Sequence, residues 1–293
     1  MVRVRAPAKL NLGLSIRDRR SDGYHEIETV FVPIRLFDEI ELRRISGPSV
    51  QLVAAYPGLP ADSRNLAVRG AEATLEALGE LAGIELRLEK RIPLAAGLGG
   101  GSSDAAAAIR GVEALLGRDL GDRRRSQLAL ELGADVPFFL DPCPALGTGI
   151  GACLSPLAEV PEMWWLLVVF PFGVSTPTAY REAARELTLP REGSSIAALL
   201  GPGGLCVSPG NDLETVATRS HPEIRQARKA LERVGAQVSG MSGSGPTVYG
   251  RFRNREDAES GRECIDLPAG ARAVVVSSPG SEAGNWGWGV AKW

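Results

Sequence analysis

The stretch that decides the fold and the chemistry is Pro93-Leu94-Ala95-Ala96-Gly97-Leu98-Gly99-Gly100-Gly101-Ser102-Ser103. It lies between a segment with strand periodicity, residues 83–89, and an alanine-rich segment of helical character, residues 104–116. Glycines let successive backbone N–H groups point at one anion, and the next helix adds the positive end of its dipole. The order strand, glycine loop, helix therefore predicts a phosphate-binding loop. Its two serines can donate hydroxyls to phosphate or help to position Mg²⁺, and Ser103 could instead cap the helix.

Other interpretations of this loop are weaker. A tight turn with no ligand explains the glycines alone but not the strand and helix around them. The pattern GxxxxGK[ST] of a P-loop NTPase is missing, as are the HRD and DFG elements of protein kinases. Dinucleotide binding needs an acidic residue at the end of a second strand, and Asp122 lies among arginines outside any predicted strand.

Outward from the loop, helices and strands mix. Strand spacing occurs at 39–44 and 49–54, a turn region at 57–63, and helical spacing at 65–81, where Asp62 or Ser63 could cap the start. Residues 163–170, 237–239, 247–252 and 273–277 predict strands, and 178–187 and 223–234 predict helices. The regular alternation of a doubly wound sheet is missing, so the pattern favours an α+β fold.

A Pro- and Gly-rich stretch at 141–161 predicts a domain junction near residue 158, dividing the chain into 1–158 and 159–293. The tail, residues 284–293, places three tryptophans among glycines. It could dock on the body of the protein or on a partner, or it could be a frayed end without a role.

Composition narrows the classes of partner. The 293 residues carry a formal net charge of −2, so no global field favours nucleic acid or an anionic membrane. The apolar core of a signal peptide is missing at the N-terminus, no apolar run is long enough to span a membrane, and the four cysteines form no CxxC pair. We therefore expect a cytoplasmic protein with reduced thiols, either a monomer or a weak homodimer.

Two charged residues stand out from their surroundings. Lys9, one of only four lysines among 33 basic residues, shares a predicted strand face with Asn11. Asp135 lies in an apolar run just after a predicted helix, and buried carboxylates are seldom unpaired. If the two meet, Lys9 keeps Asp135 ionised and orients it toward a substrate hydroxyl. The alternatives are two solvated polar positions on an edge strand, for Lys9 and Asn11, and a purely structural salt bridge between Lys9 and Asp135.

Three motifs together resemble the GHMP small-molecule kinase superfamily: PAKLNL at 7–12, the glycine loop at 93–103, and VSGMSGSGPTV at 238–248. The similarity extends over most of the chain. It implies two α+β domains, the first like ribosomal protein S5 domain 2 and the second ferredoxin-like, with the active site between them. Ala95 and Ala96 depart from the pattern, because the family often has glycine there, and this predicts a stiffer loop entrance.

The resemblance also implies roles for individual residues. Asp135 is the catalytic base, Lys9 is its partner, and the loop at 97–103, preceded by Pro93, holds the triphosphate of ATP with Mg²⁺. No residue is assigned as a metal ligand, and the choice between Ser102 and Ser103 as the Mg²⁺ contact stays open. Asn65 and Lys90 match positions near adenine, although an asparagine there is usually a helix cap and a lysine ending a strand is usually solvated.

The segments KLNL at 9–12, DGYHEI at 22–27 and GADVP at 133–137 resemble a branch of the superfamily whose substrate carries cytidine diphosphate. In that branch Tyr24 and His25 recognise cytosine, Asn11 contacts the substrate, and the 2-hydroxyl of a cytidine diphosphate-linked methylerythritol is phosphorylated. A ring can stack on a base while an imidazole bonds its edge; without the resemblance, Tyr24 would be a partly buried structural aromatic. The rivals are a homoserine or mevalonate type of kinase and a silent nucleotide-binding module.

Overall fold

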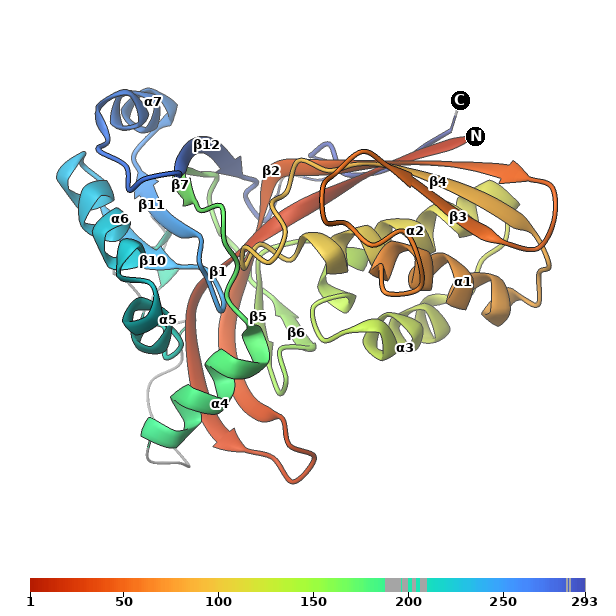
Figure 1. Ribbon diagram of the computed structural model, residues 1–293, viewed down its shortest axis with the longest axis horizontal. Coiled ribbons are helices and arrows are strands. Elements are labelled where there is room, and N and C mark those ends of the chain that lie inside the picture. Colours follow the sequence, from red (N-terminus) through yellow and green to blue (C-terminus); the bar gives the residue numbers. More distant parts are fainter. Residues whose placement is uncertain are drawn as a thin grey trace.

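The computed structural model describes residues 1–187, 196, 200–201, 204–205, 210–282, 284 and 286–292. Within these residues the chain forms two larger sheets, each covered by helices on one face (Figure 1). A two-residue pairing of β8 (Leu200–Gly201) with β9 (Gly204–Leu205) lies apart from them. The α+β expectation is confirmed.

The first sheet contains seven of the described strands, in the order β13-β1-β2-β4-β3, with β5 and β6 attached to β2. Their bounds are β1 (Val2–Arg19), β2 (His25–Ile45), β3 (Val50–Ala54), β4 (Gly83–Glu89), β5 (Ala145–Thr148), β6 (Cys153–Pro156) and β13 (Gly289–Lys292). The pairs are antiparallel except β3 with β4. The strands expected at 39–44, 49–54 and 83–89 are all present.

Helices α1 (Leu66–Leu78), α2 (Gly100–Leu116) and α3 (Asp122–Leu132) and the 3₁₀ helix η1 (Pro137–Leu140) belong to this domain. The alanine run of α2 is buried because α2 lies between the sheet and α1 (Figure 1). A Cβ on Gly70 of α1 would lie 2.8 Å from the carbonyl oxygen of Ala105. Small side chains therefore allow the close approach of these two helices.

Two helix boundaries differ from the predictions. The helix expected at 65–81 ends at Leu78, because Gly79 adopts the left-handed conformation, and its N-cap is Asn65 rather than Asp62 or Ser63. The helix expected from Asp104 begins at Gly100, so the end of the glycine run is already helical. Ser103 is therefore not the cap.

The second sheet has the order β10-β11-β7-β12, from β7 (Met163–Val169), β10 (Val238–Met241), β11 (Val248–Phe252) and β12 (Arg272–Ser278). Four further helices belong to this half of the chain: α4 (Thr176–Glu186), α5 (Glu214–Ser220), α6 (Pro222–Arg233) and α7 (Arg255–Cys264). The predicted elements here are present with small shifts, whereas α5 and α7 were not predicted. One face of this sheet packs on the helices and the other packs on β1 and β2.

The long strands β1 and β2 join the two halves (Figure 1). Leu10 and Val32 from this ribbon share one buried cluster with Trp165 and Tyr249 of the second sheet. The division at residue 158 stays a prediction, and β13 lies in the first sheet although it comes from the second of the two predicted ranges.

The described part of the tail, residues 284 and 286–292, docks on the body of the protein, and Trp293 lies outside the described residues. β13 pairs antiparallel with β1, with Val290 opposite Val4. The Trp286 ring lies 5.7 Å from the Phe37 ring, and the guanidinium of Arg5 lies 4.0 Å from the centre of the same ring. Of the alternatives for the tail, a frayed end is therefore wrong.

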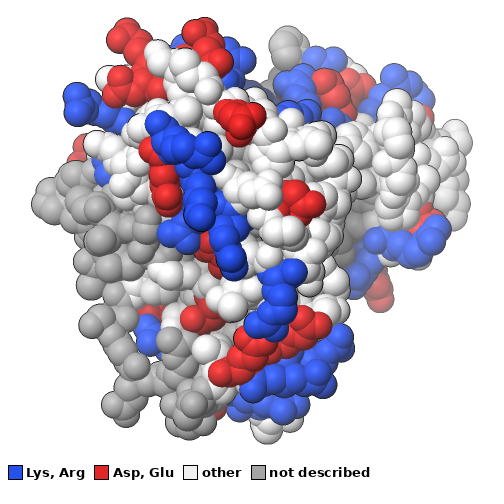
Figure 2. Space-filling view, turned by 60° about the vertical axis from the view of Figure 1, so that its left-hand side comes forward, with Lys and Arg blue, Asp and Glu red and all other residues white. Residues whose placement is uncertain are grey.

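The surface carries charges of both signs. Figure 2 shows basic and acidic side chains next to one another on one face of the molecule. This mixture agrees with the small net charge. Among the described residues, no helix is both long and apolar enough to cross a membrane.

Candidate active site

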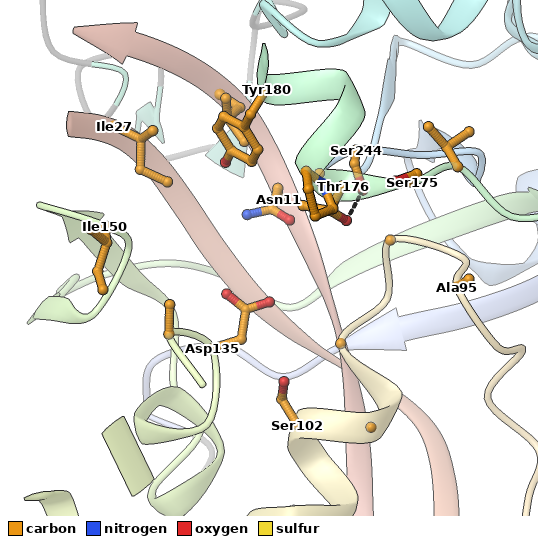
Figure 3. Close-up of a pocket in the computed structure, with 18 of the residues that line it drawn as sticks. Asn11, Ile27, Ala95, Ser102, Asp135, Ile150, Ser175, Thr176, Tyr180 and Ser244 are labelled. Atoms are coloured by element: carbon orange, nitrogen blue, oxygen red, sulfur yellow. Dashed lines mark hydrogen bonds between the residues drawn. The ribbon is translucent and has the colours of Figure 1, made fainter. Parts of the chain in front are cut away.

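One cavity of about 1280 Å³ contains most of the predicted site residues. It is lined by β1, the β1–β2 turn, the glycine loop, Asp135, one face of α4 and the β10–β11 turn. In Figure 3, Asn11, Ser102 and Asp135 point into the same space from three different segments. Segments more than two hundred residues apart therefore form one site.

Gly97 of the loop is required by its close contact with the second domain. Gly97 has a φ of 74°, and a Cβ there would lie 2.2 Å from the carbonyl oxygen of Ser242. The Ser242 hydroxyl donates to the Gly97 carbonyl at 2.9 Å, and the Thr247 N–H donates to Ala96 at 3.3 Å. The segment at 238–248 forms the hairpin between β10 and β11, and it also holds the loop in place.

Gly99 gives the loop its turn into α2. With a φ of 71° it is the N-cap of that helix, and a Cβ would lie 2.7 Å from the Phe139 ring. The first N–H groups of α2 have no partners within the helix, so they are available to an anion at this end of the cavity. Ser102 lines the cavity here. Ser103 does not, and its buried hydroxyl has no hydrogen-bond partner among the described residues.

Ala95 shows the consequence of an alanine at the loop entrance. Its φ is 49°, in the left-handed region that costs a non-glycine residue about 1–2 kcal/mol. Its Cβ lies 2.5 Å from where a Cβ on Gly173 would be, so Gly173 makes room for it. The alanine that stands here in place of the family's glycine therefore strains the backbone locally. A stiffer loop entrance stays a prediction.

Lys9 and Asp135 meet inside this cavity. The Lys9 ammonium lies 3.5 Å from Asp135 Oδ2 and also contacts Asn11 Oδ1, and the residue is only 4% exposed. Burial lowers the pKa of Lys9, and the neighbouring Asp135 carboxylate partly opposes this shift. The backbone N–H of Lys9 donates to the backbone carbonyl of Leu98 at 3.0 Å, which fixes β1 against the loop. The interpretation of Lys9 and Asn11 as solvated positions on an edge strand is wrong.

Asn11 is held in a fixed orientation by both of its polar ends. Its side-chain amide donates to Thr29 at 3.0 Å, which leaves its oxygen directed at Lys9. Its backbone N–H donates to the Ser242 hydroxyl at 3.0 Å. The same serine thus links β1, the glycine loop and the second domain.

The other end of the cavity is aromatic. Tyr24 is 60% exposed, so the interpretation of this ring as a partly buried structural aromatic is wrong. The ring of His25 lies 5.7 Å from that of Tyr180, with 17° between the planes. Burial, and then the charge of Arg19, lower the pKa of His25, so its imidazole is neutral at pH 7. All three residues line the cavity, and their rings are suited to contact with a flat heterocycle.

Asn65 and Lys90 have structural contacts. Asn65 accepts from the Ala67 N–H at 2.9 Å as the cap of α1 and does not line the cavity. Lys90 lines the cavity, yet its side chain is 1% exposed and contacts Asp38 and Asp104, the latter at 2.8 Å. The two carboxylates raise the pKa of Lys90 despite its burial. A solvated Lys90 is therefore excluded.

Several lining residues were not predicted individually, and Tyr180, Thr176 and Ser244 are among them. The Thr176 and Ser244 hydroxyls are hydrogen-bonded at 2.7 Å across the top of the cavity (Figure 3). Tyr180 occupies an ordinary amphipathic helix, and nothing in the sequence around it indicates a site. The only available signal was that Ser244 belongs to the glycine-rich motif.

The arrangement can hold a nucleoside triphosphate and an alcohol side by side. The residues present also fit Mg²⁺, because Ser102 offers an oxygen at the anion site and Mg²⁺ bound to a triphosphate needs few protein ligands. The structure contains no cluster of three or more His, Cys, Asp or Glu suited to a metal in the part of the chain that it describes.

Comparisons with known proteins agree with this geometry. The GHMP kinases N terminal domain matches residues 65–141, and the GHMP kinases C terminal domain matches residues 195–267. A 4-diphosphocytidyl-2-C-methyl-D-erythritol kinase from Geobacter sp. (strain M21) is 39% identical over 276 residues, covering 92% of this chain and 96% of that protein.

Solved structures show the same relationship. A crystal structure of 4-(cytidine 5'-diphospho)-2C-methyl-D-erythritol kinase has a TM-score of 0.79 at 37% identity and covers 95% of this chain and 99% of that one. L. major mevalonate kinase has a TM-score of 0.70 at 15% identity, with coverages of 95% and 96%, and shares the fold.

The two domains and the loop-lined cavity between them define a kinase of the GHMP class. GHMP kinases phosphorylate small molecules at the expense of ATP, which agrees with a helix N-terminus and glycine loop suited to a triphosphate. At 39% identity over nearly its full length, the chain belongs to the 4-diphosphocytidyl-2-C-methyl-D-erythritol kinase family.

Proposed function

We propose that this kinase transfers the γ-phosphoryl group of ATP to the 2-hydroxyl of 4-diphosphocytidyl-2-C-methyl-D-erythritol, in the non-mevalonate (MEP) route to isoprenoid precursors. The observation that carries the proposal is the meeting of Lys9 and Asp135 beside the glycine loop, in a cavity that continues to three aromatic rings. Family membership supports the choice of substrate.

In the proposed reaction, the N–H groups of the loop and of the first turn of α2 bind the triphosphate and compensate the charge of the transferred group. Asp135 orients the substrate hydroxyl and accepts its proton as the new oxygen–phosphorus bond forms and ADP leaves. Lys9 keeps Asp135 ionised, and Asn11 holds Lys9 in position. Because such transfers have loose transition states, a weak base suffices.

The remaining assignments follow from position. Tyr24 and Tyr180 would hold cytosine, with the neutral His25 bonding its edge. Pro93 and Leu66 line the opposite end, where we place adenine, with Asn65 and Lys90 supporting that wall from behind. Mg²⁺ would be bound by ATP and Ser102 and would supply charge neutralisation. A cytoplasmic location stays a prediction.

The test is a comparison of initial rates with the cytidine-bearing substrate and with two plain alcohols, homoserine and mevalonate. We expect one ADP per phosphorylated product and a preference for the cytidine-bearing substrate. A higher kcat/KM for a plain alcohol would favour the homoserine or mevalonate type. Failure to release ADP with any alcohol in a single turnover would favour a silent nucleotide-binding module.

A further inference from the structure

Three arginines line the cavity beside its aromatic end. Arg19 is the last residue of β1, and Arg181 and Arg185 are one turn apart on α4, so they share a helix face. All three line the same cavity as Lys9 and Asp135. Figure 2 shows basic side chains, with acidic ones among them, at the lower end of the molecule, where Figure 1 places the β1–β2 turn.

These arginines differ from their neighbours in lacking acidic partners. Arg17 pairs with Glu28 at 2.6 Å, and Arg20 pairs with Asp22 at 3.0 Å and Glu26 at 3.2 Å. In the described part of the chain, no carboxylate lies within ion-pair distance of Arg19, Arg181 or Arg185.

The three arginine side chains also make few hydrogen bonds within the described part of the chain. Arg181 donates to the Thr178 hydroxyl at 3.3 Å, and no side-chain hydrogen bond of Arg19 or Arg185 is found among the described residues. The three exposed guanidinium groups are therefore available to bind a ligand at this end of the cavity.

The position of these charges identifies the ligand they fit. Arg181 follows Tyr180 directly, and the charge of Arg19 helps to lower the pKa of its neighbour His25. The arginines therefore belong to the aromatic end of the cavity, whereas the glycine loop provides the anion site for ATP at the other end. This second basic site therefore fits an anionic group other than the triphosphate of ATP. The diphosphate of a nucleoside-diphosphate-linked alcohol is such a group.

We propose that Arg19, Arg181 and Arg185 form the subsite that attracts and binds the diphosphate of the nucleoside-diphosphate-linked alcohol. This inference rests on the proposed function and adds the residues that distinguish a diphosphate-bearing substrate from a plain alcohol. Guanidinium groups bind phosphate oxygens in bidentate fashion. Positive charge at the mouth of a cleft also raises the association rate of an anionic ligand, and salt weakens this effect.

The kinetic test uses Arg181→Gln/Arg185→Gln and Arg19→Gln, which remove charge but keep length. We expect the KM for the cytidine diphosphate-linked alcohol to rise about tenfold or more in the double variant, while kcat and the KM for ATP change less than about twofold. The salt dependence of kcat/KM for this substrate should also become shallower. The matched control is Arg253→Gln, because Arg253 is exposed, lies between β11 and α7, and does not line the cavity.

A binding test separates this inference from the proposed function. CDP, CMP and cytidine are titrated calorimetrically against the wild type and the double variant, without turnover. We expect the wild type to prefer CDP over cytidine and the double variant to lose most of that preference.

Equal losses for CDP and cytidine, or an unchanged KM in both the double variant and Arg19→Gln, would overturn the diphosphate subsite. If the wild type failed to phosphorylate the cytidine-bearing alcohol yet bound CDP through these arginines, only the proposed function would be lost.

Discussion

The two ends of the cavity are built differently. At the glycine loop, Gly97, Gly99 and Lys9 are packed against the second domain, against Phe139 and against each other, and hydrogen bonds tie β1 and the β10–β11 turn to the loop. At the aromatic end, Tyr24 is exposed and three arginines lack acidic partners among the described residues. The first end is fixed before ligands bind, and the second leaves groups available for the substrate.

This difference matches the demands of the two ligands. Phosphoryl transfer requires donors that are already in place, because reorganising them would add to the barrier. Recognition of a base and a diphosphate needs contact area and charge, which exposed side chains can supply. Changes at the loop end should therefore affect kcat and folding, and changes at the aromatic end should affect the KM of one substrate.

The largest expected effect is at Asp135. Asp135→Asn removes the proton acceptor but keeps the shape, so kcat should fall about 10²–10⁴-fold. The KM for ATP should change little, because the glycine loop, which we propose binds the triphosphate, is untouched. Steady-state kinetics with both substrates provide the measurement, and the melting temperature serves as a folding control. A near-normal kcat would remove Asp135 from the mechanism.

A glycine pair tests how rigid the loop end is. Gly97→Ala places a methyl group 2.2 Å from a carbonyl oxygen at a φ of 74°, and we expect a cost of about 2–5 kcal/mol. Gly101→Ala is the matched control, since its nearest contact would be an ordinary 3.6 Å. Thermal unfolding should show a lower Tm for the first and little change for the second. Equal Tm values would contradict a tightly constrained loop.

Lys9 should produce an early loss of activity at alkaline pH. Its ammonium is charged below its pKa, and burial lowers that pKa. As pH rises through this lowered pKa, Lys9 loses its charge and Asp135 loses its partner. The value of kcat should therefore fall at a lower pH than it would if Lys9 had the pKa of an ordinary lysine.

The control for Lys9 is an arginine in its place. Lys9→Arg should be less active, because a guanidinium does not fit the space beside Asn11, but its profile should stay flat at alkaline pH. The full pH profile of kcat for both proteins is the measurement. An alkaline fall that persists in Lys9→Arg must come from another group.

The smallest expected effect lies at the aromatic end. The pKa of His25 is lowered, so its imidazole stays neutral until pH falls below the ordinary histidine value. Further acidification protonates it and removes its acceptor nitrogen, and the KM for the cytidine-bearing substrate should then rise. The KM for ATP is the internal control, and His25→Gln should abolish this dependence. Parallel changes in both KM values would argue against a role for His25 in base recognition.

Much of the loop end was predictable. Glycines between a strand and a helix indicate an anion site because the backbone conformation is local, and Lys9 and Asp135 stood out as charges among apolar neighbours. Their contact was only a hypothesis, since 126 positions separate them. The start of α2 was misplaced because the end of a glycine run can itself be helical, as Gly100 and Gly101 show.

The aromatic end and the supporting contacts were much less predictable. Tyr180 belongs to an ordinary amphipathic helix, and only packing brings its ring beside His25. Lys90 was expected near adenine, with a solvated strand end as the alternative, and neither interpretation foresaw that Asp38 and Asp104 enclose it from other elements. Such partners depend on how β2, α2 and the end of β4 meet.

By itself, the sequence determined the class of fold, the glycine-rich loop between a strand and a helix, and the identity of the charged pair, because each depends on residue type and short-range backbone geometry. The tertiary structure decided that β1, the loop, Asp135 and α4 converge on one cavity. It also decided that Arg19, Arg181 and Arg185 line this cavity together, and that the tail pairs with β1. The physical reason is that burial and pairing depend on neighbours distant in sequence, whose positions are set only when the two sheets pack on the shared ribbon.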